Sequence, residues 1–189
     1  IQTMELGLKD AGVELMVIDT KSSHDLSDGD YGNRRTECFS AASTLGFNSL
    51  RQLSVSQLDG IDQLLTTIEL KRARHIVTEN ARVLEAVQAV KDKDYKSFGR
   101  LMNESHDSMR DDFEISTDEL NTAVSEAINL GALGARMTGG GFGGSAIALV
   151  KSKDYEQTTA GILKAFEANG HKTPEIFKVR PSAGAKRIS

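Results

Sequence analysis

The sequence contains little that would cross-link or kink the chain: among its 189 residues are one cysteine, two prolines and no tryptophan. Because Cys38 is the only cysteine, no disulfide can form within the chain, and the apolar core must hold the fold. The surrounding Arg35-Thr-Glu-Cys-Phe-Ser-Ala-Ala42 has the pattern of a helix, which predicts a buried structural thiol rather than a reactive one. This cysteine usage fits a reducing, cytoplasmic compartment.

Long apolar runs and an excess of basic charge are also missing. No run approaches the roughly 20 apolar residues that span a bilayer, and no signal peptide is visible. The net charge is −4, and the basic residues are spread along the chain. Nucleic acid and anionic membrane surfaces are therefore not expected as partners. Hydrophobic residues make up 39% of the sequence, which is enough for a packed core.

The spacing of apolar residues predicts an α+β fold. Strands are expected at 13–20, 135–137, 145–150 and 175–179, and helices at 30–45, 69–91, 94–110, 116–130 and 154–169. With the inserted helices set aside, the order is strand, helix, strand, strand, helix, strand. This order is the ferredoxin-like split βαβ arrangement, an antiparallel sheet with helices on one face. Ser116-Thr-Asp-Glu119 is predicted to form a capping box at the start of its helix.

The start of the chain predicts a fragment. The sequence begins at Ile1 and enters its first expected strand within a few residues. A natural N-terminus usually has more slack before its first element. We therefore expect residues 1–189 to be part of a longer protein.

A glycine-rich turn between two expected strands is the most informative feature. Five of the six residues 139–144 are glycine. Glycine lets a backbone approach a ligand closely, and successive N–H groups in such a turn can bind an anion. The alternative is a hairpin that packs against a neighbour and needs glycine only for space. Neither a P-loop lysine nor a helix follows the glycines, so the turn matches no standard nucleotide motif.

The turn and its flanking residues resemble a known family. Gly134-Ala-Arg-Met-Thr-Gly-Gly-Gly-Phe-Gly-Gly144 resembles the third motif of the GHMP kinases, in the form found in galactokinases. Three more segments are similar to that family: Tyr31-Gly-Asn-Arg-Arg-Thr-Glu-Cys38, Arg72-Ala-Arg-His-Ile-Val-Thr-Glu-Asn80 and Glu104-Ser-His-Asp-Ser-Met-Arg-Asp-Asp112. The resemblance runs from about residue 13 to residue 185. Ser145 stands where galactokinases often have cysteine.

The resemblance implies that residues 1–189 form the C-terminal domain of a GHMP kinase, with a short leading strand at 13–20. The parent would transfer a phosphoryl group from ATP, with Mg²⁺, to the anomeric hydroxyl of α-D-galactose, giving galactose 1-phosphate. The N-terminal ATP-binding domain is absent, and with it the sugar-gripping motif, the phosphate loop and the catalytic aspartate. We expect the fragment alone to be inactive, to hold neither ATP nor Mg²⁺, and to be able to dimerise through the exposed domain interface.

The resemblance also implies two sets of site residues. Tyr31 would contact the sugar, whereas a tyrosine near a helix start is otherwise most often a packing residue. The cleft-lining residues of the turn would be Gly139, Gly140, Gly141 and Gly143. No catalytic or metal-binding residue is expected in this half.

Other polar residues are interpreted as structural. Arg136 precedes the turn and could either aim at phosphate or pair with an acid to brace the turn. Because Arg136 and its strand neighbours Ala135 and Met137 face opposite sides, we expect the pairing with an acid. His106 with Asp107, and Asp111 with Asp112, are interpreted as ion pairs and caps rather than as acid–base or metal sites. Two alternatives to galactokinase remain open at this point: a GHMP kinase for another sugar, and a non-catalytic sugar sensor on the same fold.

Overall fold

The computed structural model describes residue 4, residues 6–22 and residues 29–180. The helices and strands are β1 (Val13–Asp19), α1 (Asp30–Thr44), α2 (Thr67–Lys91), α3 (Tyr95–Asp111), α4 (Asp118–Asn129), β2 (Gly134–Thr138), β3 (Ser145–Lys151), α5 (Tyr155–Ala168) and β4 (Glu175–Val179). Short 3₁₀ turns lie at Leu8–Ala11, Leu50–Gln52, Val55–Gln57 and Ser152–Asp154. Part of the loop expected at 21–30, and the tail beyond residue 180, lie outside the described residues.

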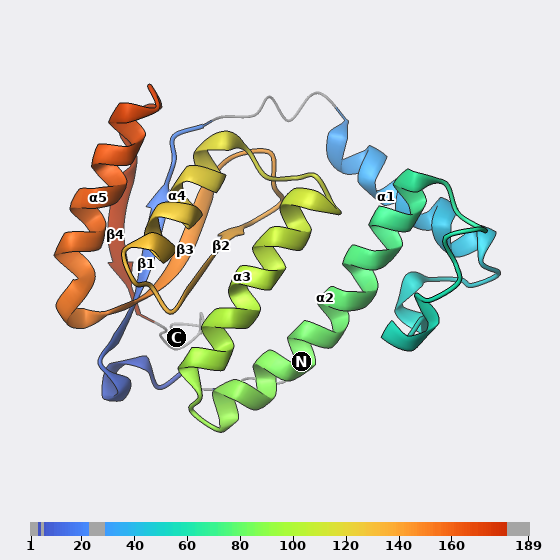
Figure 1. Cartoon of the computed structure of the whole chain (residues 1–189), viewed down its shortest axis with the longest axis horizontal. Helices are drawn as coiled ribbons and strands as arrows, with labels where there is room; N and C mark the ends of the chain where they lie inside the picture. Colours follow the sequence, from blue (N-terminus) through green and yellow to red (C-terminus); the bar gives the residue numbers. More distant parts are fainter. Residues whose placement is uncertain (1–3, 5, 23–28, 181–189) are drawn as a thin grey trace, which may run out of the picture.

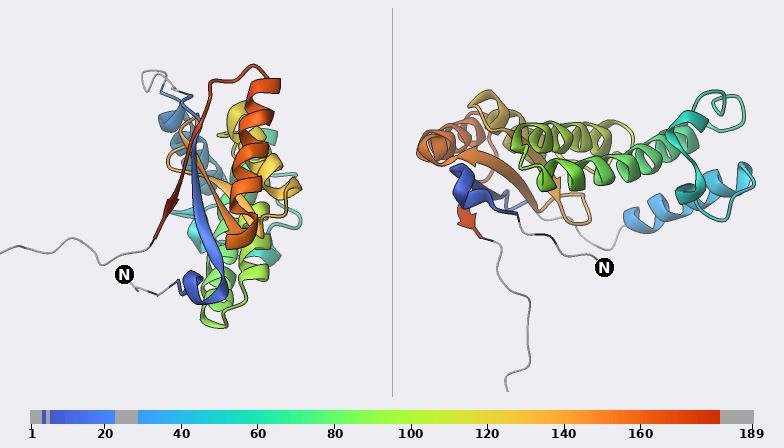
Figure 2. Two further views of the ribbon diagram at one scale, coloured as in Figure 1. Left: turned by 90° about the vertical axis from the view of Figure 1, so that its left-hand side faces the viewer. Right: turned by 90° about the horizontal axis from the view of Figure 1, so that it is seen from below.

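The four strands form one antiparallel sheet in the order β2-β3-β1-β4. Helices α3, α4 and α5 lie on one face of this sheet (Figures 1 and 2). The predicted ferredoxin-like α+β arrangement is therefore confirmed. Strands β2 and β4 are the two edges, and the β2–β3 connection carries the glycine-rich turn.

The main core lies between the sheet and helices α4 and α5. Because side chains alternate along a strand, every second residue of β1, β2 and β3 faces this core. Its members include Met16, Ile18, Leu120, Val124, Ala135, Met137, Ala146, Ala148, Ile162 and Phe166. The last residues of β2 are thus fixed by packing before the chain enters the turn.

Helices α1 and α2 extend to one side of the sheet and enclose a second, smaller core (Figure 1). Its buried residues are Ala41, Ala42, Leu50, Leu53, Ile61, Leu65, Ala73 and Val77. Cys38 packs against this cluster but is only half-buried. The predicted burial of its thiol is therefore only partial. Desolvation raises the pKa of the Cys38 thiol, which disfavours the reactive thiolate.

The predicted capping box at the start of α4 is wrong in its residues. The helix begins at Asp118, and Thr117 is the N-cap, whose hydroxyl oxygen accepts from the Leu120 amide. Ser116 instead donates its hydroxyl to Asn121 Oδ1 at 2.8 Å. Helix α2 begins at Thr67, two residues before the predicted start. Its N-cap is therefore Thr66, which forms a capping box with Glu69. In the described part of the chain no helix is long and apolar enough to cross a membrane.

Candidate functional site

The glycine-rich turn has a backbone that most residues would resist. Gly139, Gly141, Gly143 and Gly144 have φ values of 94°, 88°, 128° and 87°, and Phe142 has 63°. Only Gly140 of the five glycines has an ordinary φ. Glycine adopts a left-handed backbone at little cost, whereas other residues are strained in it. The backbone conformation therefore explains why glycine stands at four of the five positions.

At two of these positions packing also excludes a side chain. A Cβ at Gly141 would lie 2.6 Å from Ile115 Cβ, and a Cβ at Gly143 would lie 2.9 Å from the Ser22 carbonyl oxygen. At Gly139 and Gly140 nothing lies within 4 Å of the added atom. The two interpretations of the turn therefore apply to different positions: its second half packs against the protein, and its first half is open.

Hydrogen bonds fix the packed half of the turn. The Phe142 amide donates to the Ile115 carbonyl at 2.7 Å, and the Gly144 amide donates to the Ser22 carbonyl at 3.2 Å. The Gly144 carbonyl accepts from the Thr20 amide at 3.1 Å and from the Thr20 hydroxyl at 2.6 Å. Backbone groups from two distant segments thus hold the turn in one position.

Tyr31 lies in the first turn of α1 with 70% of its surface exposed. Within the described residues the Tyr31 ring is thus not covered by neighbours, and its contact with a sugar stays a prediction. Figure 1 shows the start of α1 at the same end of the molecule as the β2–β3 connection. The first turn of α1, which contains Tyr31, therefore lies at the end of the sheet that carries the β2–β3 connection.

Arg34 joins α1 to the turn. It lies three residues after Tyr31, on the same face of the helix, and its guanidinium carbon is 5.8 Å from the centre of the Phe142 ring. Its Nε donates to the Phe113 carbonyl at 2.7 Å, and its Nη2 donates to the Glu114 carbonyl at 3.2 Å. Helix α1 and the turn are thus attached to the same short segment, residues 113–115.

Arg72 of α2 supports that segment from behind. Its side chain is 2% exposed, and it donates to Glu37 at 2.6 Å, to the Asp112 carbonyl at 2.5 Å and to the Glu114 carboxylate at 2.8 Å. Hydrogen bonds from Lys71 and Arg72 hold the pKa of Glu114 below its ordinary value. The buried guanidinium is thereby paired, as a buried charge must be.

The prediction that Arg136 pairs with an acid is confirmed, whereas its bracing of the turn stays a prediction. Its Nη1 lies 3.2 Å from Glu79 Oε1, and its Nε donates to the Met137 carbonyl at 3.0 Å. Glu79 also accepts from the Ser105 hydroxyl at 2.6 Å and pairs with Arg82. Burial opposes ionisation of Glu79, but the Ser105 hydroxyl and the two arginines outweigh it and lower its pKa.

The histidines of the helices are structural in their contacts. His75 Nδ1 lies 3.0 Å from the Ser108 hydroxyl, and its ring stacks on Phe113 at 4.3 Å between centroids. His106 Nδ1 accepts from the Met137 amide at 3.3 Å. Burial is the main cause that lowers the pKa of each to about 4. Both rings are therefore neutral at pH 7, which does not suit a general acid.

The acidic residues at the end of α3 form ion pairs, as predicted. Asp107 and Asp111 pair with Arg110 at 3.1 and 2.7 Å, and Asp112 pairs with Arg74 at 3.2 Å. Among the residues that the structure describes, no group of three or more His, Cys, Asp and Glu side chains is arranged to hold a metal ion.

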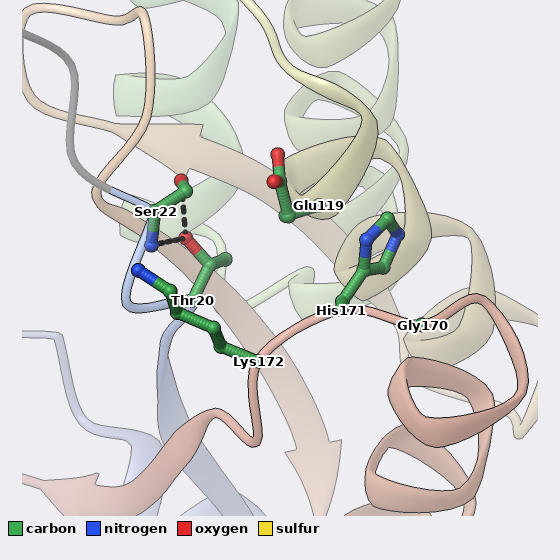
Figure 3. Close-up of a pocket in the computed structure, with 6 residues that line it drawn as sticks. All are labelled: Thr20, Ser22, Glu119, Gly170, His171 and Lys172. Carbon is green, nitrogen blue, oxygen red and sulfur yellow. Dashed lines mark hydrogen bonds between the residues drawn. The ribbon is translucent and has the colours of Figure 1, made fainter.

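A polar pocket of about 300 Å³ borders the packed half of the turn. Figure 3 shows Thr20 and Ser22 on one side of it, Glu119 from α4, and Gly170, His171 and Lys172 from the segment after α5. The Thr20 and Ser22 hydroxyls lie 2.8 Å apart. Because these two residues also form the hydrogen bonds to Gly144, the pocket lies next to the support of the turn. Sequence patterns gave no sign of this pocket, since its residues come from three distant segments.

Comparison with known proteins finds one matching family model and several similar enzymes. The family model described as "GHMP kinases C terminal" matches residues 84–169. The chain is 44% identical to a galactokinase of Streptomyces coelicolor over 94% of its own length and 46% of that protein. It is 38% identical to a galactokinase of Mycobacterium bovis, with 92% of the chain and 48% of that protein covered. The chain thus spans about half the length of the curated relatives it matches.

Solved structures agree with this result. A Lactococcus lactis galactokinase complexed with galactose superimposes with a TM-score of 0.93 at 30% identity, over 99% of this chain and 49% of that one. An L. major mevalonate kinase in complex with R-mevalonate shares the fold, with a TM-score of 0.55 at 24% identity over 91% of this chain and 44% of that one. Residues 84–169 therefore match the C-terminal domain of the GHMP kinases, and the chain as a whole is similar to about half of a galactokinase.

Proposed function

We propose that residues 1–189 are the C-terminal domain of an ATP-dependent galactokinase. The complete protein transfers the γ-phosphoryl group of ATP to the anomeric hydroxyl of α-D-galactose and releases ADP and galactose 1-phosphate. The likeness to galactokinases over almost the whole chain supports this proposal. One structural observation supports it further: Tyr31 is exposed on α1, the Arg34 guanidinium of the same helix lies 5.8 Å from the Phe142 ring of the turn, and the first two glycines of that turn are open.

In this proposal the chain supplies one wall of the sugar cleft. The phenol of Tyr31 exchanges a hydrogen bond with a sugar hydroxyl. Gly139 and Gly140 let the sugar and the transferring group approach the backbone, because no Cβ stands in the way. Gly141 and Gly143 keep that backbone in place through their packing against Ile115 and Ser22. Catalysis of phosphoryl transfer depends mostly on such positioning, together with charge stabilisation.

The remaining parts of the reaction are assigned to a preceding domain. That domain contributes the aspartate beside the reacting hydroxyl and the loop around the ATP phosphates, and the binding site lies between the domains. Mg²⁺ is assigned to that domain as well, next to the ATP phosphates with which it binds. The metal would neutralise charge on the transferring phosphates. We also propose that the enzyme works in the cytoplasm.

The proposal is tested with the complete protein and with residues 1–189 alone, in a coupled assay for ADP release. The complete protein is expected to consume ATP in the presence of galactose and to form galactose 1-phosphate. Residues 1–189 alone are expected to show no turnover, because loss of even one preorganised stabilising group commonly costs about 10²–10³ in rate. A matched set of hexoses differing at single hydroxyls serves as the specificity control.

Each other outcome has a defined meaning. A complete protein that phosphorylates another sugar faster than galactose would make it a different GHMP kinase. A complete protein that binds galactose without ADP release would make it a sugar sensor. Turnover by residues 1–189 alone would contradict the assignment of the catalytic groups to another domain.

A further inference from the structure

Strand β2 is an edge strand, and the groups on its free side are satisfied by side chains. The Ala135 amide donates to Asn103 Oδ1 at 2.8 Å, and the Met137 amide donates to His106 Nδ1 at 3.3 Å. The Met137 carbonyl accepts from Arg136 Nε at 3.0 Å. An unpaired buried amide is costly, and an edge strand normally leaves such groups open. Here helix α3 takes the place of a fifth strand.

The register of α3 against β2 is fixed by two glycines. A Cβ at Gly99 would overlap the Leu133 carbonyl, and a Cβ at Gly134 would overlap the Gly99 carbonyl. Backbone therefore touches backbone where α3 meets the start of β2. Asn103 and His106 are three residues apart on one face of α3, and Ala135 and Met137 are two residues apart on one side of β2. These two spacings place Asn103 at the Ala135 amide and His106 at the Met137 amide, on the free side of β2.

The His106 ring has a single arrangement that fits its surroundings. Since Nδ1 accepts from the Met137 amide, the ring is neutral and carries its proton on Nε2. His106 is 2% exposed, and among the described residues Nε2 has no hydrogen-bond partner of normal geometry. Asp107 and Arg110 of α3, Asn121 of α4 and Arg136 of β2 are the polar and charged groups that face it.

We propose, on the basis of the galactokinase function proposed above, that His106 is a positioning residue for the cleft. Its Nδ1 atom holds the Met137 amide, two residues before Gly139, and so sets where the open half of the glycine-rich turn enters the cleft. His106 neither touches substrate nor transfers a proton. The only contact of the ring that serves the reaction is the one made by Nδ1.

Two substitutions separate the two ring nitrogens. In His106→Asn the side-chain oxygen can reach the position of Nδ1, so the contact with Met137 is retained and the Nε2 end is removed. In His106→Gln the amide reaches the position of Nε2, and the acceptor for Met137 is lost. The complete enzyme with each substitution is assayed for kcat and for both KM values. Hydrogen exchange of the segment 135–144 is measured in the same proteins.

The expected result is a division between the two variants. His106→Asn is expected to keep kcat within about threefold of the wild type and to leave exchange of the Met137 amide slow. His106→Gln is expected to lose about ten- to hundredfold in kcat, as small misplacements near a reacting group do, with faster exchange at Met137. Its KM for ATP is expected to stay within about twofold, because the ATP site lies on the other domain.

Val90→Ala, in a buried position near the far end of α2, serves as the control for general destabilisation. It is expected to lower the melting temperature without a change in kcat of the folded protein. Equal losses of kcat in His106→Asn and His106→Gln would overturn the proposal, as would faster exchange at Met137 with unchanged kcat. A wild-type enzyme without galactokinase activity would instead contradict the proposed function, and the exchange data would still report the contact.

Discussion

The Phe142 amide donates to the Ile115 carbonyl at 2.7 Å, and this bond joins the glycine-rich turn to the segment on which Arg34 and Arg72 converge. The same segment therefore positions both the start of α1, with Tyr31, and the packed half of the turn. Changes that loosen it are expected to disturb the two sides of the cleft together. The predictions below separate that support from direct contact with substrate.

Alanine substitutions at the adjacent Gly140 and Gly141 should differ in their effect on stability. Gly141→Ala is expected to lower the free energy of unfolding by about 1–3 kcal/mol, because its φ is 88° and its Cβ would meet Ile115 at 2.6 Å. Gly140→Ala has an ordinary φ and open space, so its stability is expected to match the wild type. Thermal unfolding of the complete protein measures both.

The activity of these variants tests the cleft assignment. Gly140→Ala is expected to reduce kcat/KM for galactose, because the new methyl group projects from the open half of the turn. Gly141→Ala, corrected for its folded fraction, is expected to be less impaired. Full activity of well-folded Gly140→Ala would remove the open half of the turn from the cleft.

Arg72 should contribute far more stability than its exposed neighbour. Arg72→Met leaves Glu37 and Glu114 without their buried partner and frees the Asp112 carbonyl. Loss of one partner of a buried pair is costly, but the two carboxylates are 25% and 41% exposed, so we expect about 2–3 kcal/mol. Lys71→Met removes only an exposed pair and is expected to cost less than about 1 kcal/mol. Urea unfolding compares them, and equal losses would mean that the Arg72 network is not a support.

The free energy of unfolding should decrease as the pH is lowered, because two buried histidines are neutral in the folded protein. The pKa of His75 and that of His106 are each lowered from 6.5 to about 4. Between these values the unfolded chain binds protons that the folded chain excludes, so stability is full above about pH 6.5 and is lost as the pH falls towards 4. We expect a loss of about 1–3 kcal/mol per histidine over this window.

Urea unfolding at several pH values between 7.5 and 4.5 measures this loss. His106→Asn cannot titrate and is expected to flatten the profile by about the share of one histidine. A wild-type profile that is flat between pH 6.5 and 4.5 would show that the two rings are not buried as neutral groups in solution.

The sequence predicted the sheet, its order and the helices correctly because apolar periodicity reports burial directly. It failed where the outcome depends on a single residue of register. At α4, a start one residue later made Thr117 the cap in place of Ser116. On α2, Val83 and Leu84 share the helical spacing of the buried Val77 and Val90, but they are 54% and 73% exposed. Periodicity alone cannot tell which part of a long helix has a neighbour.

The candidate site was predicted only in part. Its glycines and Tyr31 were named from motif resemblance, and their roles stay predictions. The pairing of Arg136 with an acid was expected from strand alternation and is present. The division of the turn into a packed and an open half depends on Ile115 and Ser22, which lie far away in the sequence. The contact between His106 and the Met137 amide likewise depends on how α3 meets β2. Such contacts follow from tertiary packing and leave no local pattern.

The most direct test of the account is the galactose dependence of Tyr31→Phe in the complete enzyme. The substitution keeps the ring and removes the hydroxyl, and its stability should be unchanged because Tyr31 is 70% exposed. Loss of one hydrogen bond costs about 0.5–1.5 kcal/mol, which predicts a roughly two- to tenfold increase in the KM for galactose. The KM for ATP is expected to stay unchanged. Unchanged KM for galactose and unchanged kcat in the folded variant would contradict a sugar-contacting wall built on α1.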